Sequence, residues 1–248
     1  EVMYLDALVI AQAVHNNGGI VMMQVQKMVK KATLHPKAVR IPGYLVDIVV
    51  IDPDQTQLYG GAPVNRFISG DFVLDDSQQT ALPLNQRKLV ARRALFEMRK
   101  GAVGNVGVGI ADGIGLVARE EGCADDFILT VETGPIGGIT SQGIAFGANV
   151  NTRAILDMTS QFDFYHGGGL DVCYLSFAEV DRHGNVGVHK FNGKIMGTGG
   201  FIDISATSKK IIFCGTLTAG SLKTEVANGK LNIVRSGRPG EKIRQRIT

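Results

Sequence analysis

The chain has few cysteines, and their spacing matches no metal-binding or disulfide pattern. Its 3 cysteines, Cys123, Cys173 and Cys214, lie far apart in 248 residues and form no Cys-x-x-Cys pair. An odd number of scattered thiols argues against a disulfide framework and against a zinc site. It fits a reducing compartment, so we expect a cytoplasmic protein. Cys173 and Cys214 stand in apolar runs, DVCYL and IIFCG, where cysteine packs as a small hydrophobic residue.

Long apolar runs and a large charge imbalance are missing as well. No apolar stretch reaches the length of a membrane span and no signal peptide is visible, so we expect no membrane partner. The formal net charge is +3, too small for a dedicated nucleic-acid-binding protein, and we expect no nucleic-acid partner. The most basic stretch, KMVKKATLHPKAVR at 27–40, is typical of a solvated face; the alternative is a patch that attracts an anionic ligand.

The residue patterns of several enzyme classes are also absent. His, Asp and Glu form no cluster with metal-ligand spacing, so we expect no metal. No Gly-x-Ser-x-Gly sequence marks a serine hydrolase. The 5 histidines are scattered, and His35 before a proline and His183 in the turn DRHGN are typical of loop residues rather than of catalytic bases.

Glycine is abundant, with 32 residues gathered in short loops, and such loops favour sites built from the backbone. Apolar runs typical of strands alternate with helical patterns. This alternation predicts an α/β fold with an open, largely parallel sheet flanked by helices. We expect helices at 4–15, 84–100, 111–122 and 151–162, strands at 20–29, 41–53, 102–110, 127–131, 169–180 and 201–205, a hairpin at 224–237 and a connecting segment at 52–82. In the helix at 84–100, one face carries Leu89, Ala94, Leu95 and Met98, and Gly101 ends it.

The segment GNVGVGIADG, 104–113, is a glycine-rich loop between an expected strand and an expected helix. Such a loop can present backbone N–H groups to negative charge at a helix N-terminus. A dinucleotide fingerprint is the alternative, although Gly107, Gly109 and Gly113 give a spacing one residue too long. Glu132 ends the next strand, where a ribose-binding acid would stand. A second glycine loop directly after Glu132 argues against that alternative, because a ribose-binding acid does not need one.

The stretch LTVETGPIGG, 129–138, places a carboxylate at the end of an expected buried strand. Ligands of open α/β sheets bind at the carboxyl ends of strands. From the residues alone, Glu132 can be a general base, a metal ligand, a nucleophile or a structural acid.

Two further glycine-rich segments each lead into an expected strand that carries an acid. HGGGLDVCYLSFAEVDRHGNV contains Asp171, and IMGTGGFIDIS contains Asp203. Both can be simple turns, or they can form the walls of a cleft beside Glu132. Gly199 and Gly200 in the second segment either line that cleft or serve a turn that needs positive φ.

Taken together these segments resemble the family I coenzyme A transferases, most closely the single-chain short-chain acyl-CoA:acetate type and also the 3-ketoacid type. The motifs are GNVGVGIADG as the glycine loop, VETGPIGG as the E-x-G-x-x-G catalytic loop, GGGLDVCYLSFAEVDRHGNV as the strand-turn and GTGGFIDIS as the G-x-G-G-x-x-D segment. LHPKAVRIPGYLVDIVV is similar to the end of the family's first half. The resemblance covers nearly the whole chain.

The resemblance implies that Glu132 attacks an acyl-CoA thioester and becomes a glutamyl-CoA thioester, which passes CoA to a carboxylate such as acetate in a ping-pong reaction. A glutamate with an ordinary pKa of about 4.3 is already ionised at neutral pH and needs no activating base. The resemblance assigns CoA binding or oxyanion stabilisation to Gly107, Val108, Gly109, Ile110 and Ala111, and to Gly199 and Gly200. CoA is then a covalently carried co-substrate, and no cofactor is implied.

The same resemblance implies an architecture of two similar α/β halves with the active site between them. Residues 1–78 would be the tail of the first half with a connecting segment, and 79–248 the second, catalytic half, which we expect to be truncated. The expected partners are an acyl-CoA, a small carboxylate, the missing first half of the same enzyme, and further copies in a homo-oligomer. The alternatives are an acyl-CoA hydrolase on the same fold and a non-catalytic nucleotide-binding α/β module.

Overall fold

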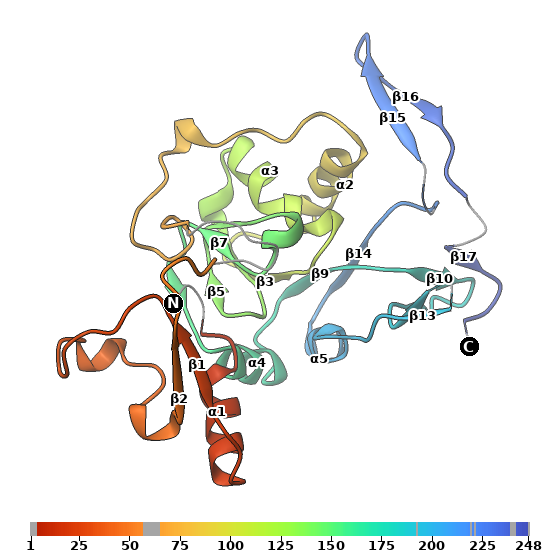
Figure 1. Cartoon of the computed structure of the whole chain (residues 1–248). Helices are drawn as coiled ribbons and strands as arrows, with labels where there is room; N and C mark the ends of the chain where they lie inside the picture. Colours follow the sequence, from red (N-terminus) through yellow and green to blue (C-terminus); the bar gives the residue numbers. More distant parts are fainter. Residues whose placement is uncertain are drawn as a thin grey trace.

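A six-stranded sheet forms the centre of the molecule (Figure 1). The computed structural model describes residues 4–56, 65–191, 193–218, 220, 222–238 and 242–247. The strands stand in the order β14 (Ile211–Cys214), β9 (Val172–Ser176), β3 (Val103–Val106), β4 (Ile128–Thr130), β5 (Pro135–Ile136) and β8 (Ala154–Ile155). The first four are parallel to one another, whereas β5 and β8 run antiparallel to their neighbours. The predicted α/β fold with a largely parallel sheet is therefore confirmed.

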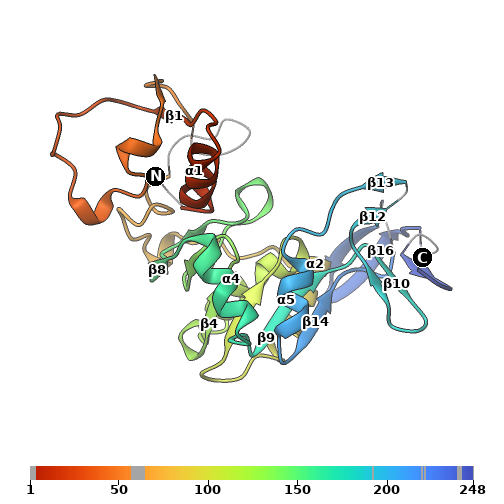
Figure 2. The same cartoon turned by 90° about the horizontal axis from the view of Figure 1, so that it is seen from below.

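Helices cover both faces of this sheet. α2 (Gln86–Leu95) and α3 (Ile114–Glu120) pack on one face, and α4 (Met158–His166) and α5 (Phe201–Thr207) pack on the other (Figures 1 and 2). Successive residues of β9 enter the two cores in turn, Val172 and Tyr174 on the first face and Cys173 and Leu175 on the second. Burial on both faces explains why β9 is a continuous apolar run. Cys173 and Cys214 are buried packing residues, as predicted.

The helix expected at 84–100 is shorter than predicted. The Asn85 side chain accepts hydrogen bonds from the N–H groups of Arg87 and Lys88 and so begins α2. The helix ends at Leu95, and Gly101 adopts φ 78° beyond it. Ala91, Ala94 and Leu95 are its buried residues, whereas Leu89, expected on the buried face, is 38% exposed.

Two predictions about local structure are wrong. Residues 201–205, expected as a strand, form α5, because Phe201 and Ile204 contact the core at helical spacing while Ile202 is 59% exposed. The helix expected at 151–162 begins only at Met158, and β8 precedes it at the edge of the sheet.

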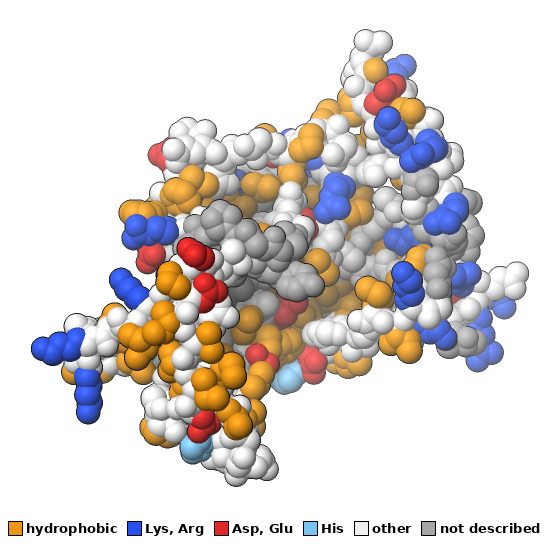
Figure 3. Space-filling view, in the orientation of Figure 1, with side chains coloured by type: hydrophobic (Ala, Val, Ile, Leu, Met, Phe, Trp, Pro, Cys, Tyr) orange, Lys and Arg blue, Asp and Glu red, His pale blue; other side chains and the backbone are white. Residues whose placement is uncertain are grey.

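The N-terminal part is a small unit beside the main sheet (Figure 1). It consists of α1 (Ala7–Asn16) and a two-stranded parallel sheet of β1 (Met22–Val25) and β2 (Ile48–Ile51), both shorter than expected. Every residue of β2 is exposed. Figure 3 shows apolar side chains gathered over this part of the surface, and the exposed set includes Val9, Ile10, Met22, Ile48, Val50 and Ile51. A parallel pair this short, with β2 exposed along its whole length and β1 only partly buried, lacks the burial that normally stabilises parallel strands.

The C-terminal part carries a small mixed sheet and a separate hairpin. In the sheet, β10 (Glu179–Asp181) pairs antiparallel with β11 (Val186–Gly187) and parallel with β17 (Ile243–Arg244). The predicted hairpin is confirmed as β15 (Lys223–Ala227) and β16 (Lys230–Arg235), and it projects from the molecule in Figure 1. Its turn, Asn228-Gly229, has positive φ at both residues, which matches the twist of a two-residue hairpin.

The remaining elements are short. They are β6 (Ile139–Thr140), β7 (Asn149–Val150), β12 (Lys190–Phe191), β13 (Lys194–Ile195) and the 3₁₀ turns η1 (Pro36–Ala38), η2 (Gly43–Leu45), η3 (Asp76–Gln78), η4 (Ile110–Gly113), η5 (Ala124–Asp126) and η6 (Gly143–Ala145). In the predicted connecting segment, 57–64 lie outside the described residues, and η3 is the helical turn in the rest.

Candidate active site at the carboxyl edge of the sheet

Glu132 lies in a tight turn that joins β4 to β5. The N–H of Gly134 donates to the carbonyl of Val131 at 3.0 Å, and the N–H of Val131 donates to the carbonyl of Pro135 at 3.1 Å. Glu132 is the second residue of this turn and is half-buried. The chain reverses directly after the carboxylate, so Glu132 projects from the carboxyl edge of the parallel strands.

Gly134 is the residue that makes this turn possible. Its φ is 119°, and a Cβ atom at this position would lie 2.1 Å from the carbonyl oxygen of Leu156. No side chain fits there without a shift of the backbone. The glycine after Glu132 therefore fixes the path of the chain, which is a structural reason for part of the VETGPIGG motif.

The glycine loop lies at the same edge as Glu132. β3 and β4 are parallel, and Asn105 pairs with Thr130 in their register. Gly107 and Glu132 each follow two residues later, so both chains leave the sheet side by side. The structure thus brings together two motifs that the sequence separates.

The contacts within the loop show which of its N–H groups are free. Gly107 donates its N–H to the carbonyl of Tyr174 at 2.8 Å. Gly109 has φ 112°, and its N–H donates to the buried carboxylate of Asp112. By contrast, the N–H groups of Val108 and Ile110 meet no acceptor in the described part of the chain.

Side chains from neighbouring elements hold the loop in place. Ser176 at the end of β9 donates its hydroxyl to the carbonyl of Val108 at 2.7 Å. Arg87 on α2 donates to the carbonyl of Gly109 at 2.7 Å and lies 3.3 Å from Asp112. Burial raises the pKa of Asp112, and the Arg87 charge and the Gln142 amide oppose that rise.

The electrostatic surroundings of Glu132 are neutral. Burial raises the pKa of this carboxyl above its ordinary value, and hydrogen bonds from its own backbone N–H and from Asn105 oppose the rise. Asn105 Nδ2 lies 3.5 Å from Glu132 Oε2. No lysine, arginine or histidine in the described ranges forms an ion pair with this carboxylate. The ordinary pKa expected from the sequence therefore does not apply to this glutamate.

Sequence reasoning missed the polar residues behind Glu132. Asn105, Thr130, Gln161 and Tyr165 are buried and hydrogen-bonded to one another beneath the carboxylate. A signal for one of them was visible, because Asn105 is a polar residue inside the buried strand VGNV. Gln161 and Tyr165 belong to α4, and nothing in the local sequence connects that helix to Glu132.

Gly199 and Gly200 stand just before α5. Since α5 runs back toward the start of β14, its N-terminus points toward the carboxyl edge of the sheet. Gly199 has φ 51°, and a Cβ at Gly200 would lie 2.8 Å from the Phe162 ring of α4. The fold alone thus explains why both positions carry glycine. Contact of these glycines with a ligand stays a prediction.

The two acids expected as turn residues or cleft walls have other partners. Asp171 accepts hydrogen bonds from the Val103 N–H at 2.9 Å and from Lys209 at 2.8 Å, which places it at the amino edge, away from Glu132. Asp203 lies within α5 rather than in a turn that leads into a strand, and it pairs with His166 at 2.8 Å. The cleft-wall interpretation is wrong for Asp171.

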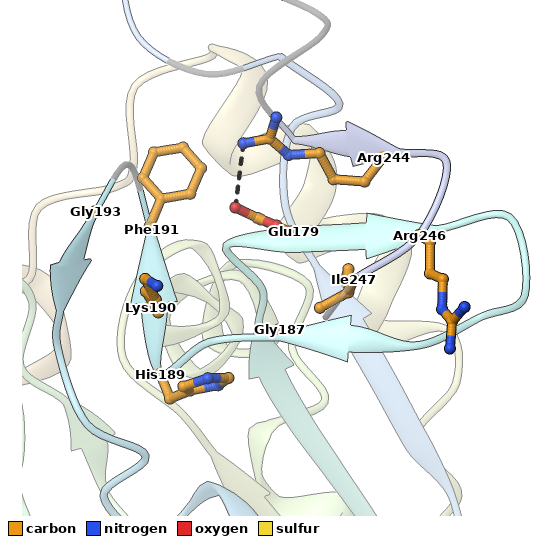
Figure 4. Close-up of a pocket in the computed structure, with 9 residues that line it drawn as sticks. All are labelled: Glu179, Gly187, His189, Lys190, Phe191, Gly193, Arg244, Arg246 and Ile247. Atoms are coloured by element: carbon orange, nitrogen blue, oxygen red, sulfur yellow. Dashed lines mark hydrogen bonds and ion pairs between the residues drawn. The ribbon is translucent and has the colours of Figure 1, made fainter.

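A separate cavity of about 310 Å³ lies among β10, β11, β12 and β17 (Figure 4). Its lining is basic on balance, with Arg244 paired to Glu179 at 3.3 Å. Figure 4 shows Lys190 and Arg246 at opposite sides of the cavity, so their charges do not converge on one point. Glu132 does not line this cavity.

No group of three or more His, Cys, Asp or Glu side chains in the described ranges could hold a metal ion. Within the same residues, no helix has the length and apolar character to span a membrane.

Comparisons with known proteins give a consistent result. The chain is 93% identical over 245 residues to the acetate CoA-transferase YdiF of Escherichia coli K12, covering 99% of this chain and 46% of that protein. It is 38% identical over 249 residues to the caffeate CoA-transferase of Acetobacterium woodii, covering 98% and 47%. No family model matches the chain.

Comparison with solved structures also identifies acyl-CoA transferases as similar proteins. The apoenzyme of the acyl-CoA transferase YdiF from Escherichia coli O157:H7 superposes with a TM-score of 0.85 at 90% identity, covering 98% of this chain and 45% of that one. The thioester complex of the same enzyme with CoA gives 0.86 at 89% identity, covering 97% and 44%. The chain spans about half the length of the curated relatives it matches.

Proposed function

This chain belongs to the family I coenzyme A transferases, and we propose that its protein transfers CoA between a short-chain acyl-CoA and a carboxylate such as acetate. The observation that carries the proposal is the position of Glu132. It is a half-buried carboxylate without an ion-pair partner in the described part of the chain, held at the carboxyl edge beside a glycine loop. This is where ligands of open α/β sheets bind.

Glu132 acts as the nucleophile in this proposal. Its carboxylate oxygen attacks the thioester carbonyl, the carbon–sulfur bond breaks, and an acyl-glutamyl anhydride and CoA thiolate result. The thiolate then attacks the glutamyl carbonyl and releases the acyl group as a carboxylate, which leaves a glutamyl-CoA thioester. The incoming carboxylate reverses these steps. One thioester is present at every resting stage, so no ATP is consumed.

The surroundings of Glu132 suit this chemistry. A half-buried carboxylate has lost part of the water that would otherwise have to leave before attack. Asn105 donates to one carboxylate oxygen, which opposes protonation and partly offsets the effect of burial. The other oxygen can face the thioester.

The glycine loop is proposed to stabilise the oxyanions that form in each addition. The N–H groups of Val108 and Ile110 meet no acceptor in the described residues and are the preferred donors. The N–H groups of Gly107 and Gly109 donate to acceptors within the protein, so these two residues shape the loop. Ala111 belongs to η4, which follows the loop. Gly199 and Gly200 are proposed to contact CoA from the neighbouring α5.

The proposed architecture has the active site between two halves. Residues 1–78 would belong to the tail of the first half and the connection, and 79–248 to the second half. The exposed apolar residues of β1 and β2 support this division, since helices normally cover both faces of a parallel sheet in an α/β half. We also propose a homo-oligomer in the cytoplasm, with CoA as the covalently carried co-substrate.

Isotope exchange tests the function of the full-length enzyme. With acetyl-CoA and labelled acetate as the only substrates, a ping-pong transferase moves label into acetyl-CoA. Exchange that requires Glu132 supports the proposal. Release of CoA and acetate without exchange would indicate a hydrolase, and binding without either reaction would indicate a non-catalytic module. Both outcomes contradict transfer.

A further inference from the structure

Four polar side chains are buried together beneath Glu132. Asn105 on β3, Thr130 on β4, and Gln161 and Tyr165 on α4 are each at most 2% exposed. Buried polar groups cost free energy unless they are hydrogen-bonded, and apolar residues of similar size would fill the space without that cost. A polar set at this place therefore needs a reason beyond packing.

The hydrogen bonds among these residues can run in only one direction. Thr130 Oγ1 lies 3.0 Å from the carbonyl oxygen of Gly104, which can only accept, so the threonine hydroxyl donates its proton there. The Thr130 oxygen then accepts the proton of the Tyr165 hydroxyl at 2.8 Å. The phenol oxygen in turn accepts from Gln161 Nε2 at 2.9 Å and from Asn105 Nδ2 at 3.2 Å.

This chain of bonds decides how the Asn105 amide is turned. Its Nδ2 faces both the Tyr165 oxygen, at 3.2 Å, and Glu132 Oε2, at 3.5 Å. The opposite orientation would place the amide oxygen against two acceptors. Asn105 Oδ1 meets no donor in the described part of the chain, so its donor side alone selects the orientation.

We propose that Tyr165 is a positioning residue for Glu132. Its phenol oxygen holds the Asn105 amide so that an N–H donates to Oε2, which leaves Oε1 of Glu132 directed at the thioester carbon. This inference rests on the proposed role of Glu132 as the nucleophile. Orientation of a nucleophile contributes to rate without adding a contact to the substrate.

Tyr165 is suited to this task because it carries no charge. Burial raises the pKa of Tyr165 to about 12, and the carboxylate of Glu132 contributes to the rise, so the phenol stays protonated at neutral pH. The ring is held by packing as well as by its hydroxyl, with the Phe162 ring at 5.8 Å in an edge-on arrangement. A phenylalanine at this position should therefore keep the ring in place and remove only the oxygen.

The test compares two buried tyrosines in the full-length enzyme. Tyr174 on β9 is also 0% exposed, but its hydroxyl meets no partner in the described residues, which makes Tyr174→Phe the matched control. We measure the rate constant for glutamyl-CoA formation by intact mass in a single turnover, the KM for acetyl-CoA, and thermal unfolding. Tyr165→Phe should slow adduct formation at least about tenfold, or ~1.4 kcal/mol in activation free energy, with KM within about twofold. Tyr174→Phe should leave the rate constant and the KM unchanged. It should not lower thermal stability, because it removes a buried hydroxyl that has no partner in the described residues.

An unchanged rate constant in Tyr165→Phe, or an equal loss in Tyr174→Phe, would overturn the inference. If Tyr165→Phe does not fold, Thr130→Val takes its place. That change frees the phenol proton to turn toward the Asn105 amide and should also slow the adduct, so a normal rate in folded Thr130→Val would overturn it too. A wild-type enzyme that forms no adduct contradicts the proposed function itself. A wild-type adduct with an unaffected Tyr165→Phe contradicts this inference alone.

Discussion

Acidic side chains at the two edges of the central sheet have different partners and opposite shifts in pKa. At the amino edge, Asp171 pairs with Lys209, and Glu97 pairs with Lys210. Hydrogen bonds from these lysines lower the pKa of both acids, that of Glu97 to about 2 with help from Arg93. At the carboxyl edge, Glu132 has neutral partners and a raised pKa.

This difference separates acids that support the fold from an acid that is available for chemistry. An exposed ion pair keeps a carboxylate ionised and bound to its cationic partner, and each such pair contributes little to stability. A carboxylate that is half-buried without a cation costs stability, and a cost of that kind is typical of functional sites. Substitutions at the two edges should therefore differ in their effects on activity and on stability.

Glu132→Gln should have the largest effect. The amide is nearly isosteric, so the fold should survive, but a neutral amide is a poor nucleophile and the adjacent Thr133 has no base beside it in the sequence. Turnover of the full-length enzyme should fall roughly a thousandfold or more, while acyl-CoA binding weakens little. A steady-state assay with a binding titration checks this. Near-normal transfer by a folded Gln variant would remove Glu132 from the mechanism.

Gly109→Ala should be more harmful than Gly101→Ala. Both glycines have positive φ, but a Cβ at Gly109 would also lie 2.5 Å from Ser176 Oγ, whereas a Cβ at Gly101 meets open space. We expect a loss of about 2–3 kcal/mol at Gly109 and about 1 kcal/mol at Gly101. Denaturant unfolding measures both. Equal losses would show that the packing of the glycine loop on Ser176 is unimportant.

The raised pKa of Glu132 predicts a pH-dependent stability difference. A carboxyl whose pKa is higher in the folded state binds its proton more tightly when folded, so it lowers stability as pH rises through that pKa. Glu132→Gln should therefore raise the melting temperature by a few degrees at neutral pH and lose that advantage in acid, below the ordinary glutamate pKa. Melting curves across pH check this. An advantage that is constant with pH would indicate another cause.

Asp171→Ala should have the smallest effect. The change removes the hydrogen bond to the Val103 N–H and an exposed ion pair with Lys209, at the edge remote from Glu132. We expect a loss of about 1 kcal/mol and unchanged turnover. Because the pKa of Asp171 is lowered in the fold, its contribution is present above the unfolded-state pKa and disappears as pH falls. A large loss of activity in this variant would contradict the division between the two edges.

The sequence allowed the sheet and Glu132 to be predicted because these signals are local. Apolar runs mark β4 and β9, and the carboxylate follows β4 directly. The segment at 201–205 misled because its three apolar residues, Phe201, Ile202 and Ile204, fit the period of a strand as well as that of a helix. Only packing of Ile204 against the core selects the helix.

The hydrogen-bond network could not be predicted, because its members are distant in sequence. Tyr165 lies 60 residues from Asn105 and 35 from Thr130. The direction of each bond depends on which oxygen already donates, and that becomes known only when all of the groups are placed together. The contact with α4 is a property of the fold and not of any motif.

Intact mass and peptide mapping after incubation with acetyl-CoA, without an acceptor, test the central claim most directly. The full-length enzyme should gain one CoA, with loss of acetate, on the peptide that carries Glu132, and Glu132→Gln should gain none. Cys123, the cysteine that is not fully buried, is the competing site for an adventitious adduct. An adduct that maps to Cys123, or one that persists in Glu132→Gln, would contradict the account.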